Sequence, residues 1–294
     1  MSESRRLFCF GLGYTGLALA RSLMGDGWTV AGTCREAARR DALAAEGIDA
    51  WLFEESNPLK DAPAALAGAT HLLASAPPGE DGDAAAFLHG GAIAATETLA
   101  WIGYLSTTGV YGDHGGGWVD EDSPLTPSSE RSGRRVAAEK QWLDFWWNDG
   151  IPTQIFRLAG IYGPGRGPLA AVRAGTAKRI HKPGHLFSRI HRDDIVATLR
   201  ASMERPNGGR VYNVCDDAPA AQAEVVAFAA ELLGLDPPPL VPIEEAALSP
   251  MGLSFYADNK RVRNDRIKKE LGVTLAYPDY RSGLGALLDQ ADSR

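Results

Sequence analysis

Three glycines near the start of the chain, Gly11, Gly13 and Gly16, follow a short apolar run with the spacing G-x-G-x-x-G. Between a strand and a helix this spacing suits a dinucleotide, because the first glycine permits a tight turn, the second lets the pyrophosphate approach and the third allows close packing. The helix N-terminus would add unpaired N–H groups and a partial positive charge. The pattern predicts dinucleotide binding; a plain strand–helix turn that uses glycines for positive φ is the alternative.

The end of the second expected strand bears on the choice between NAD and NADP. Residues 32–35 read Gly-Thr-Cys-Arg, with no acid at the tip to bind a ribose 2′-hydroxyl. Arg35, together with Arg39 and Arg40 one turn later, could pair with a 2′-phosphate, and Thr33 could add a hydroxyl donor. These residues favour NADP over NAD, although such a run of arginines also suits a solvated helix face.

Strand and helix signals alternate along most of the chain, which predicts an α/β fold with a Rossmann-type, doubly wound parallel sheet. Apolar runs predict strands, and apolar residues at helical spacing predict helices. The expected strands are residues 7–10, 28–33, 48–53, 71–74, 101–106, 153–158 and 211–214, and the expected helices are 17–24, 37–45, 84–99, 134–147, 193–203, 220–233, 244–248, 259–271 and 283–291.

Four motifs, in this order, resemble those of the extended short-chain dehydrogenase/reductases, the NAD-dependent epimerase/dehydratase superfamily. They are the loop at 11–16, Leu-Ser-Thr-Thr-Gly-Val-Tyr-Gly at 105–112, Arg-Leu-Ala-Gly-Ile-Tyr-Gly-Pro-Gly at 157–165 and Arg-Ile-His-Arg-Asp-Asp at 189–194. Residues 75–79 and 126–135 are similar to those of the YeeZ-like atypical group, which keeps the dinucleotide loop and lacks the usual tyrosine.

The resemblance implies a Rossmann domain over residues 1–165. It also implies that residues 166–294 complete the sheet, over about 185–216, and form a small C-terminal substrate lobe. The expected cofactor-binding residues are Gly11, Gly13, Tyr14, Thr15, Gly16, Thr33, Arg35, Ser75, Ala76, Pro77, Ser106 and Ile161.

The residues expected to do chemistry depart from the family pattern. Thr107 stands four residues before Tyr111, where the family has a Ser or Thr that bonds the reacting substrate oxygen. Counting back from Glu139, however, places Arg135 at the position of the family's lysine and Arg131 at that of its catalytic tyrosine. Arginine stays protonated in proteins and cannot shuttle a proton. Both arginines could still bind a phosphate, a carboxylate or a developing oxyanion, or be surface charges.

Composition excludes several classes of protein. Thirty Lys and Arg against thirty-seven Asp and Glu give a net charge of −7, which argues against general nucleic-acid binding. No apolar run is long enough to cross a bilayer and no signal peptide is evident, so no membrane partner and a cytoplasmic location are expected. The three cysteines fit neither a disulfide framework nor a zinc site, and we expect no metal.

Residues 134–147 contain Trp142, Trp146 and Trp147, and one helix face cannot easily bury all three. This aromatic load suggests a homodimer as one hypothesis, since the matching helix in the family often forms a dimer seam.

Two functions remain open at this stage. The first is an NAD(P)-dependent epimerase/dehydratase-like oxidoreductase, acting on a sugar nucleotide or small carbonyl substrate with a non-standard proton donor. The second is a catalytically silent NAD(P)-binding sensor or scaffold. Intact cofactor-binding motifs fit both functions. The functions differ in what the missing tyrosine means: the first requires another proton donor, and the second requires no catalysis.

Overall fold

A computed structural model describes residues 5–292 of the chain. These residues form two compact units, each assembled from three segments of the chain. Unit 1 contains residues up to 107, 133–157 and 196–212, and unit 2 contains 108–132, 158–195 and 213 onward. The sequence-based division at residue 165 treats each part as one continuous segment, whereas these units interleave along the chain.

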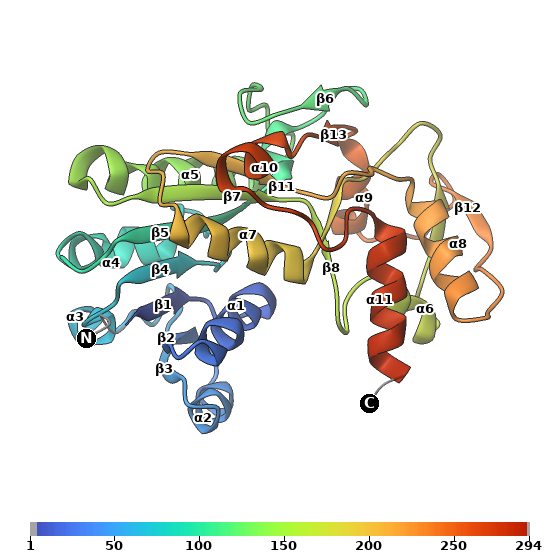
Figure 1. Ribbon diagram of the computed structural model, residues 1–294. Helices are drawn as coiled ribbons and strands as arrows, with labels where there is room; N and C mark the ends of the chain where they lie inside the picture. Colours follow the sequence, from blue (N-terminus) through green and yellow to red (C-terminus); the bar gives the residue numbers. More distant parts are fainter. Residues whose placement is uncertain (1–4, 293–294) are drawn as a thin grey trace. The chain divides into compact units, whose positions relative to one another are not determined.

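Unit 1 is built on a seven-stranded sheet with the order β11-β7-β5-β4-β1-β2-β3 (Figure 1), of which β11 runs on into unit 2. The pairs β1–β2, β1–β4, β2–β3 and β4–β5 are parallel, as a doubly wound fold requires. The strands are β1 (Arg6–Phe10), β2 (Thr29–Cys34), β3 (Asp49–Leu52), β4 (His71–Ala74), β5 (Trp101–Thr107), β7 (Thr153–Leu158) and β11 (Val211–Val214).

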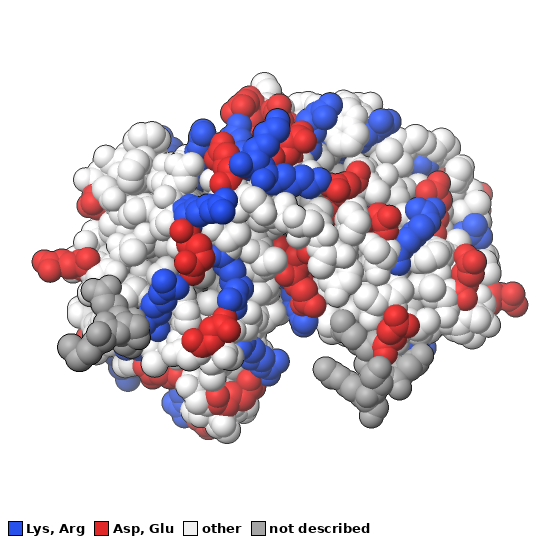
Figure 2. All heavy atoms as spheres, in the orientation of Figure 1, with Lys and Arg blue, Asp and Glu red and all other residues white. Residues whose placement is uncertain are grey.

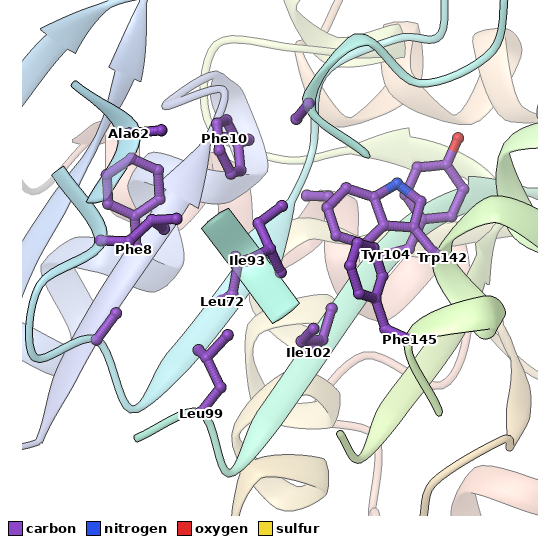
Figure 3. Close-up of a cluster of buried hydrophobic side chains, with 14 of the residues drawn as sticks. Phe8, Phe10, Ala62, Leu72, Ile93, Leu99, Ile102, Tyr104, Trp142 and Phe145 are labelled. Atoms are coloured by element: carbon purple, nitrogen blue, oxygen red, sulfur yellow. The ribbon is translucent and has the colours of Figure 1, made fainter. Parts of the chain in front are cut away.

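One face of this sheet packs against α3 (Ala62–Leu66), α4 (Ala84–Ala94) and α5 (Glu130–Asp149). The side chains of Phe8, Leu72 and Ile102 project from three strands into this cluster (Figure 3). Alternate residues of a strand point to opposite faces, so the same strands can also bury side chains on the other side. The burial of both faces explains why the strands read as nearly continuous apolar runs.

The opposite face carries α1 (Tyr14–Gly25) and α7 (Arg192–Glu204). Arg200 of α7 donates hydrogen bonds to the hydroxyl of Ser22 at 2.8 Å and to the carboxylate of Asp26 at 2.5 Å, both at the end of α1. The indole N–H of Trp101, in β5, donates a hydrogen bond to the hydroxyl of Ser202, in α7, at 3.2 Å. These polar contacts fix α7 against α1 and β5. The remaining helix of unit 1, α2 (Ala37–Ala45), follows β2.

Unit 2 contains three small parallel strand pairs and a separate apolar core. The pairs are β8 (Gly160–Tyr162) with β10 (Arg189–His191), β9 (Arg179–His181) with β12 (Leu240–Pro242), and β6 (Trp118–Val119) with β13 (Arg261–Val262). The helices are α6 (Pro168–Arg173), α8 (Gln222–Leu232), α9 (Pro250–Ala257), α10 (Asp265–Leu271) and α11 (Tyr280–Asp292), and a 3₁₀ turn, η1, covers Thr108–Tyr111. Side chains from α6, α8 and α11 form the core.

The sequence-based elements are confirmed for the seven strands of the sheet and wrong in three helices. Residues 244–248 are not helical, since a turn over 243–245 continues into irregular chain. The expected helix over 259–271 begins only at Asp265, because Arg261 and Val262 pair as a strand with β6. The expected helix over 84–99 ends at Ala94. In each of the three segments, the spacing of apolar residues does not reveal the tertiary contact or turn that ends or prevents the helix.

Charged side chains of both signs are interspersed over the face drawn in Figure 2. Among the described residues, no helix combines the length and apolar character that crossing a membrane requires.

The three tryptophans of α5 have three different environments. Trp142 is fully buried and stacks near Tyr104, with ring centroids 6.0 Å apart. Trp146 packs against the chain at Gly208 and Gly209, where a Cβ atom would lie within 3 Å of its ring. Trp147 remains 69% exposed. Within unit 1 the helix therefore buries one indole fully and a second partly, and the homodimer stays a prediction.

We expect Trp142→Ala to lower the free energy of unfolding by about 3–5 kcal/mol, because it leaves a cavity in the core of unit 1. Trp147→Ala, in the same helix, should change it by less than about 0.5 kcal/mol. Urea unfolding followed by circular dichroism measures both, and equal losses in the two variants would contradict this account of the core.

Candidate functional site

The turn between β1 and α1 is held against two neighbouring strands. Gly11 has φ of +93°, and a Cβ atom there would lie 3.0 Å from the backbone nitrogen of Ala76. The amide of Gly11 donates to the hydroxyl of Thr33 at 2.9 Å, and the amide of Leu12 donates to the carbonyl of Thr33. The turn after β1 is thereby fixed to the carboxyl ends of β2 and β4.

The other two glycines of the loop have distinct surroundings. A Cβ atom on Gly16 would lie 2.8 Å from the carbonyl oxygen of Gly11 and 2.9 Å from the sulfur of Cys9, so Gly16 allows α1 to pack closely on β1. At Gly13 a Cβ atom would meet nothing within 4 Å. Gly13 is the N-cap of α1 and has no side chain with which to cap it. The N-terminus of α1 therefore faces open space.

The remaining loop residues and the end of β4 lie around this turn. Tyr14 and Thr15 open α1, and Thr15 is 5% exposed. The amide of Ser75 donates to the carbonyl of Phe10 at 2.9 Å, which brings residues 75–77 next to the loop. The structure thus brings together seven of the expected cofactor residues without assigning a ligand to them: Gly11, Gly13, Tyr14, Thr15, Gly16, Ser75 and Ala76. Pro77 follows directly in the chain.

The end of β2 presents its arginines to solvent. Arg35 and Arg39 are exposed, whereas Arg40 pairs with its neighbour Asp41 at 2.8 Å. Thr33 is 1% exposed and its hydroxyl accepts from the Gly11 amide, so this side chain supports the glycine loop. Burial raises the pKa of the Cys34 thiol between these residues, so that it is less reactive than an ordinary cysteine.

At the end of β5, one of the two candidate arginines already has partners. Arg135 donates to the phenolic oxygen of Tyr104 at 3.0 Å and to the carbonyl of Leu105 at 2.7 Å. Its guanidinium carbon lies 5.7 Å from the centre of the Tyr104 ring. Thr107 ends the same strand two residues later. Arg135 therefore ties α5 to the strand that carries Thr107.

One turn further along α5, three buried polar side chains form a network. Glu139 pairs with Arg157 of β7 at 2.7 Å, and both side chains are 5% exposed. The hydroxyl of Ser106 donates to the same carboxylate at 2.5 Å. The sequence identifies Ser106 and Glu139 but misses the role of Arg157. The available signal is a charged residue inside the apolar strand 153–158, since a buried charge needs a partner.

Arg131 and Ile161 belong to unit 2 and have neighbours there. The guanidinium carbon of Arg131 lies 5.9 Å from the centre of the Phe255 ring, at the end of α9. Ile161 lies in β8, where it is the partner of Ile190 in β10. Arg131 is exposed, so its charge is free to meet an anion from solvent.

Tyr104, Tyr111 and Tyr162 are buried. Burial is the main cause that raises the pKa of Tyr104 and of Tyr162 above the ordinary value. Tyr111 is fully buried and donates to the side-chain oxygen of Asn213 at 2.7 Å. At ordinary pH Tyr104 and Tyr162 keep their protons, which makes them poor bases.

A Tyr-x-x-x-Lys sequence does occur at Tyr256 and Lys260, but it does not form one helical turn. α9 ends at Ala257, between the two residues. The ammonium of Lys260 donates to the carbonyl of Gly112 at 2.8 Å, and Tyr256 is 8% exposed. The spacing is therefore not a displaced copy of the family's pair.

His191 and its acidic neighbours serve the fold. The Nδ1 atom of His191 accepts from the amide of Asp193 at 3.2 Å at the start of α7. The carboxylate of Asp194 accepts from the amides of Ala276 and Tyr277 at 2.7 and 3.0 Å. Over residues 5–292 there is no group of three or more His, Cys, Asp or Glu side chains that could hold a metal ion.

Asp216, at the end of β11 in unit 2, is 1% exposed. One carboxylate oxygen accepts from the amide of Ala218, and the other has no hydrogen-bond partner among the described residues. Burial raises its pKa to about 8, and the nearby charge of Arg189 offsets only part of that effect.

Comparison with known proteins identifies close relatives of the whole chain. No family model matches it. Protein YeeZ from Escherichia coli (strain K12) is 31% identical over 283 residues, which cover 94% of this chain and 97% of YeeZ. A functionally unknown conserved protein from Silicibacter pomeroyi DSS is 50% identical, with a TM-score of 0.89 over 98% of this chain and 99% of that one.

A more distant solved structure shares only the fold. UDP-glucuronic acid 4-epimerase from Bacillus cereus, solved in complex with NAD, is 18% identical, with a TM-score of 0.77 over 97% of this chain and 96% of that one. The likeness shows that the two chains share a Rossmann-type fold.

The buried Asp216 predicts a pH-dependent stability. An unfolded aspartate ionises near its ordinary pKa of 3.8, whereas the folded one keeps its proton until about pH 8. The stabilising contribution is therefore complete below about pH 4 and is lost as the pH rises towards 8. Asp216→Asn should melt at a higher temperature than the unaltered protein at pH 8, with the difference shrinking towards pH 5.

Thermal unfolding across that pH range measures the difference. Asp236→Asn, an exposed position in the same unit, controls for the loss of one carboxylate. If Asp216→Asn melts lower than the unaltered protein at pH 8, the folded carboxyl is ionised there and the raised pKa is refuted.

Proposed function

The chain belongs to the YeeZ family, an atypical branch of the extended short-chain dehydrogenase/reductases, and on that premise we propose that it is an NADP-dependent epimerase/dehydratase-like oxidoreductase. Its substrate is a sugar nucleotide or a small carbonyl compound, and its proton donor is not the family's tyrosine. The observation that carries the proposal is the open space at Gly13, in front of the uncapped N-terminus of α1.

The residues around the glycine loop fit a dinucleotide. The backbone amides at the start of α1 would receive the pyrophosphate, because helix N-terminal N–H groups and the helix dipole favour anions. Ser75, Ala76 and Pro77 would line the same edge at the end of β4, at the point where ligands of doubly wound sheets bind. When bound, a nicotinamide cofactor supplies hydride transfer.

The preference for NADP rests on the end of β2. The exposed Arg35 and Arg39 can approach a 2′-phosphate, and a guanidinium binds phosphate through paired hydrogen bonds. Arg40 already pairs with Asp41, so we assign the recognition to the first two arginines. Thr33 acts indirectly, because its buried hydroxyl holds the Gly11 amide.

At the other end of the cofactor site, we assign different roles to Thr107 and Arg135. Thr107, at the carboxyl end of β5, would orient the substrate oxygen through its hydroxyl. Arg135 acts as a positioning residue, because its donors reach Tyr104 and Leu105 of the same strand. Arg131 belongs to unit 2, and its part in the chemistry stays a prediction.

A catalytically silent NADP-binding sensor or scaffold is the second candidate. It is favoured by the burial of Tyr104, Tyr111 and Tyr162 and by the arginines at the positions of the family's tyrosine and lysine. Both candidates require the cofactor, and only the first requires turnover.

Calorimetric titration should show that NADPH binds more tightly than NADH, because two exposed arginines lie beyond β2 and no acid ends it. Replacement of both arginines, Arg35→Ser with Arg39→Ser, should weaken NADPH binding about tenfold and leave NADH binding nearly unchanged. Equal affinities in the unaltered protein, or tighter NADH, would exclude the NADP preference.

Gly13→Ala should weaken NADPH binding at least about tenfold, because the added methyl group occupies the space assigned to the pyrophosphate. Folding should be unaffected, since that methyl group meets no protein atom within 4 Å. Gly91→Ala in α4 is the matched control, because a Cβ atom at Gly91 would also meet no protein atom within 4 Å. Undiminished NADPH affinity in Gly13→Ala would remove the pyrophosphate from this loop.

Product analysis after incubation with NADP(H) and a panel of sugar nucleotides and small carbonyl compounds separates the two candidates. We expect turnover by the unaltered protein and its loss in Thr107→Val, which keeps the side-chain shape and removes the hydroxyl. Turnover that appears only in the double variant Arg131→Tyr/Arg135→Lys, which restores the family's proton shuttle, would instead support the silent candidate.

A further inference from the structure

Unit 2 contains a pocket of about 330 Å³ that the glycine loop does not explain. Residues 179–187 form one wall, the first turn of α8 forms another, and Leu240 and Tyr256 complete it. All of these residues lie in unit 2, so the pocket is complete within that unit. Its volume is at the lower end of the range for small-molecule sites.

The first turn of α8 gives this pocket an anion-attracting wall. The N-cap residue is Ala221, whose methyl group cannot accept a hydrogen bond from the helix amides. The first intrahelical bond runs from the amide of Val225 to the carbonyl of Ala221, which leaves the amides of residues 222–224 without intrahelical acceptors. In a helix of eleven residues, these amides also carry the positive end of the helix dipole.

A buried, unpaired histidine forms another part of the lining. His185 is 2% exposed, and neither of its ring nitrogens has a hydrogen-bond partner among residues 5–292. Burial and the charge of Lys182 lower the pKa of His185, and the nearby backbone of Asp258, whose geometry falls short of a hydrogen bond, offsets only part of that effect. Phe187 and Tyr256 pack around the ring, with centroids 4.5 and 5.4 Å away. Leaving such a polar group unpaired costs free energy that a ligand would recover.

The charged side chains of the pocket are mostly basic. Lys182 donates to the carbonyl of Tyr256, and the Nε atom of Arg179 donates to the carbonyl of Ala223 at 3.4 Å. Each of these cations retains further N–H groups, since an ammonium has three and a guanidinium five. Among the lining residues Glu224 is the single acid, and it is exposed.

We propose that this pocket binds a small oxyanion, a phosphoryl or carboxylate group, between the first amides of α8, the ring N–H of His185 and the ammonium of Lys182. The proposal is independent of the cofactor site, because the pocket and all the named donors belong to unit 2. The size of the pocket admits the anionic group with a small attached body.

Titration with inorganic phosphate tests the proposal by nuclear magnetic resonance, with the full-length protein in a buffer free of oxyanions. The backbone amides of residues 222–224 should shift and saturate. His185→Phe, which keeps an aromatic ring, and Lys182→Met should each weaken binding about tenfold, the effect of one charge-assisted hydrogen bond. Lys269→Met, at an exposed lysine outside the pocket, should leave the affinity unchanged.

Ala221→Asp tests the same proposal even if the His185 and Lys182 variants fail to fold. Its carboxylate would cap α8, raise the melting temperature and occupy the anion position, so phosphate binding should be lost from a protein that is more stable. Phosphate that binds this variant as tightly as the unaltered protein would overturn the proposal.

Separate titrations with methyl phosphate and with acetate identify the source of the oxyanion, and tighter binding of either one assigns that group. Saturation by uridine without a response to phosphate, methyl phosphate or acetate would overturn the proposal, because the pocket would then recognise a ring rather than an anion. An NADPH titration of Ala221→Asp distinguishes the oxyanion pocket from the glycine-loop site. We expect this variant to bind NADPH as the unaltered protein does, whatever the outcome for the cofactor proposal.

Discussion

The attachment of the first strand–helix turn to the neighbouring strands is the constraint on which the proposed cofactor site depends. Gly11 can lie against Ala76 only because it has no side chain, and its amide is fixed by the hydroxyl of Thr33. These contacts hold the start of α1 in one place. A helix N-terminus binds an anion well only when its amides are already oriented, since ordering them on binding would cost free energy.

A second layer of fixed groups lies where β5 ends. Arg135 bonds the Tyr104 hydroxyl and the Leu105 carbonyl, and Ser106 bonds the carboxylate of Glu139, which Arg157 neutralises. A buried carboxylate with a paired guanidinium and a hydroxyl donor is well satisfied, and removing one partner would leave a costly charge. Arg135, which the sequence comparison predicts at the position of the family's lysine, is therefore part of a rigid support for the end of β5.

Each unit contains a helix whose N-terminus lacks a capping side chain, in different surroundings. In unit 1 a glycine caps α1 and leaves space in front of it, whereas in unit 2 an alanine caps α8 next to a pocket lined by basic residues. Both helix starts lack the Ser, Thr, Asp or Asn that would normally satisfy their amides. An external anion could satisfy the amides of such a helix start, so this shared feature is the basis of both binding proposals.

Local sequence patterns were enough to predict the sheet and the glycine loop. Strands buried on both faces give continuous apolar runs, and the close approaches at Gly11 and Gly16 require glycine, so both features are visible in the sequence. The partners of Arg135 and Arg157, the unpaired state of His185 and the irregular chain at residues 244–248 could be found only from the folded arrangement. Those outcomes depend on which distant segments lie beside these residues, and the energy of a charge or a buried ring nitrogen is set by such neighbours rather than by its place along the chain.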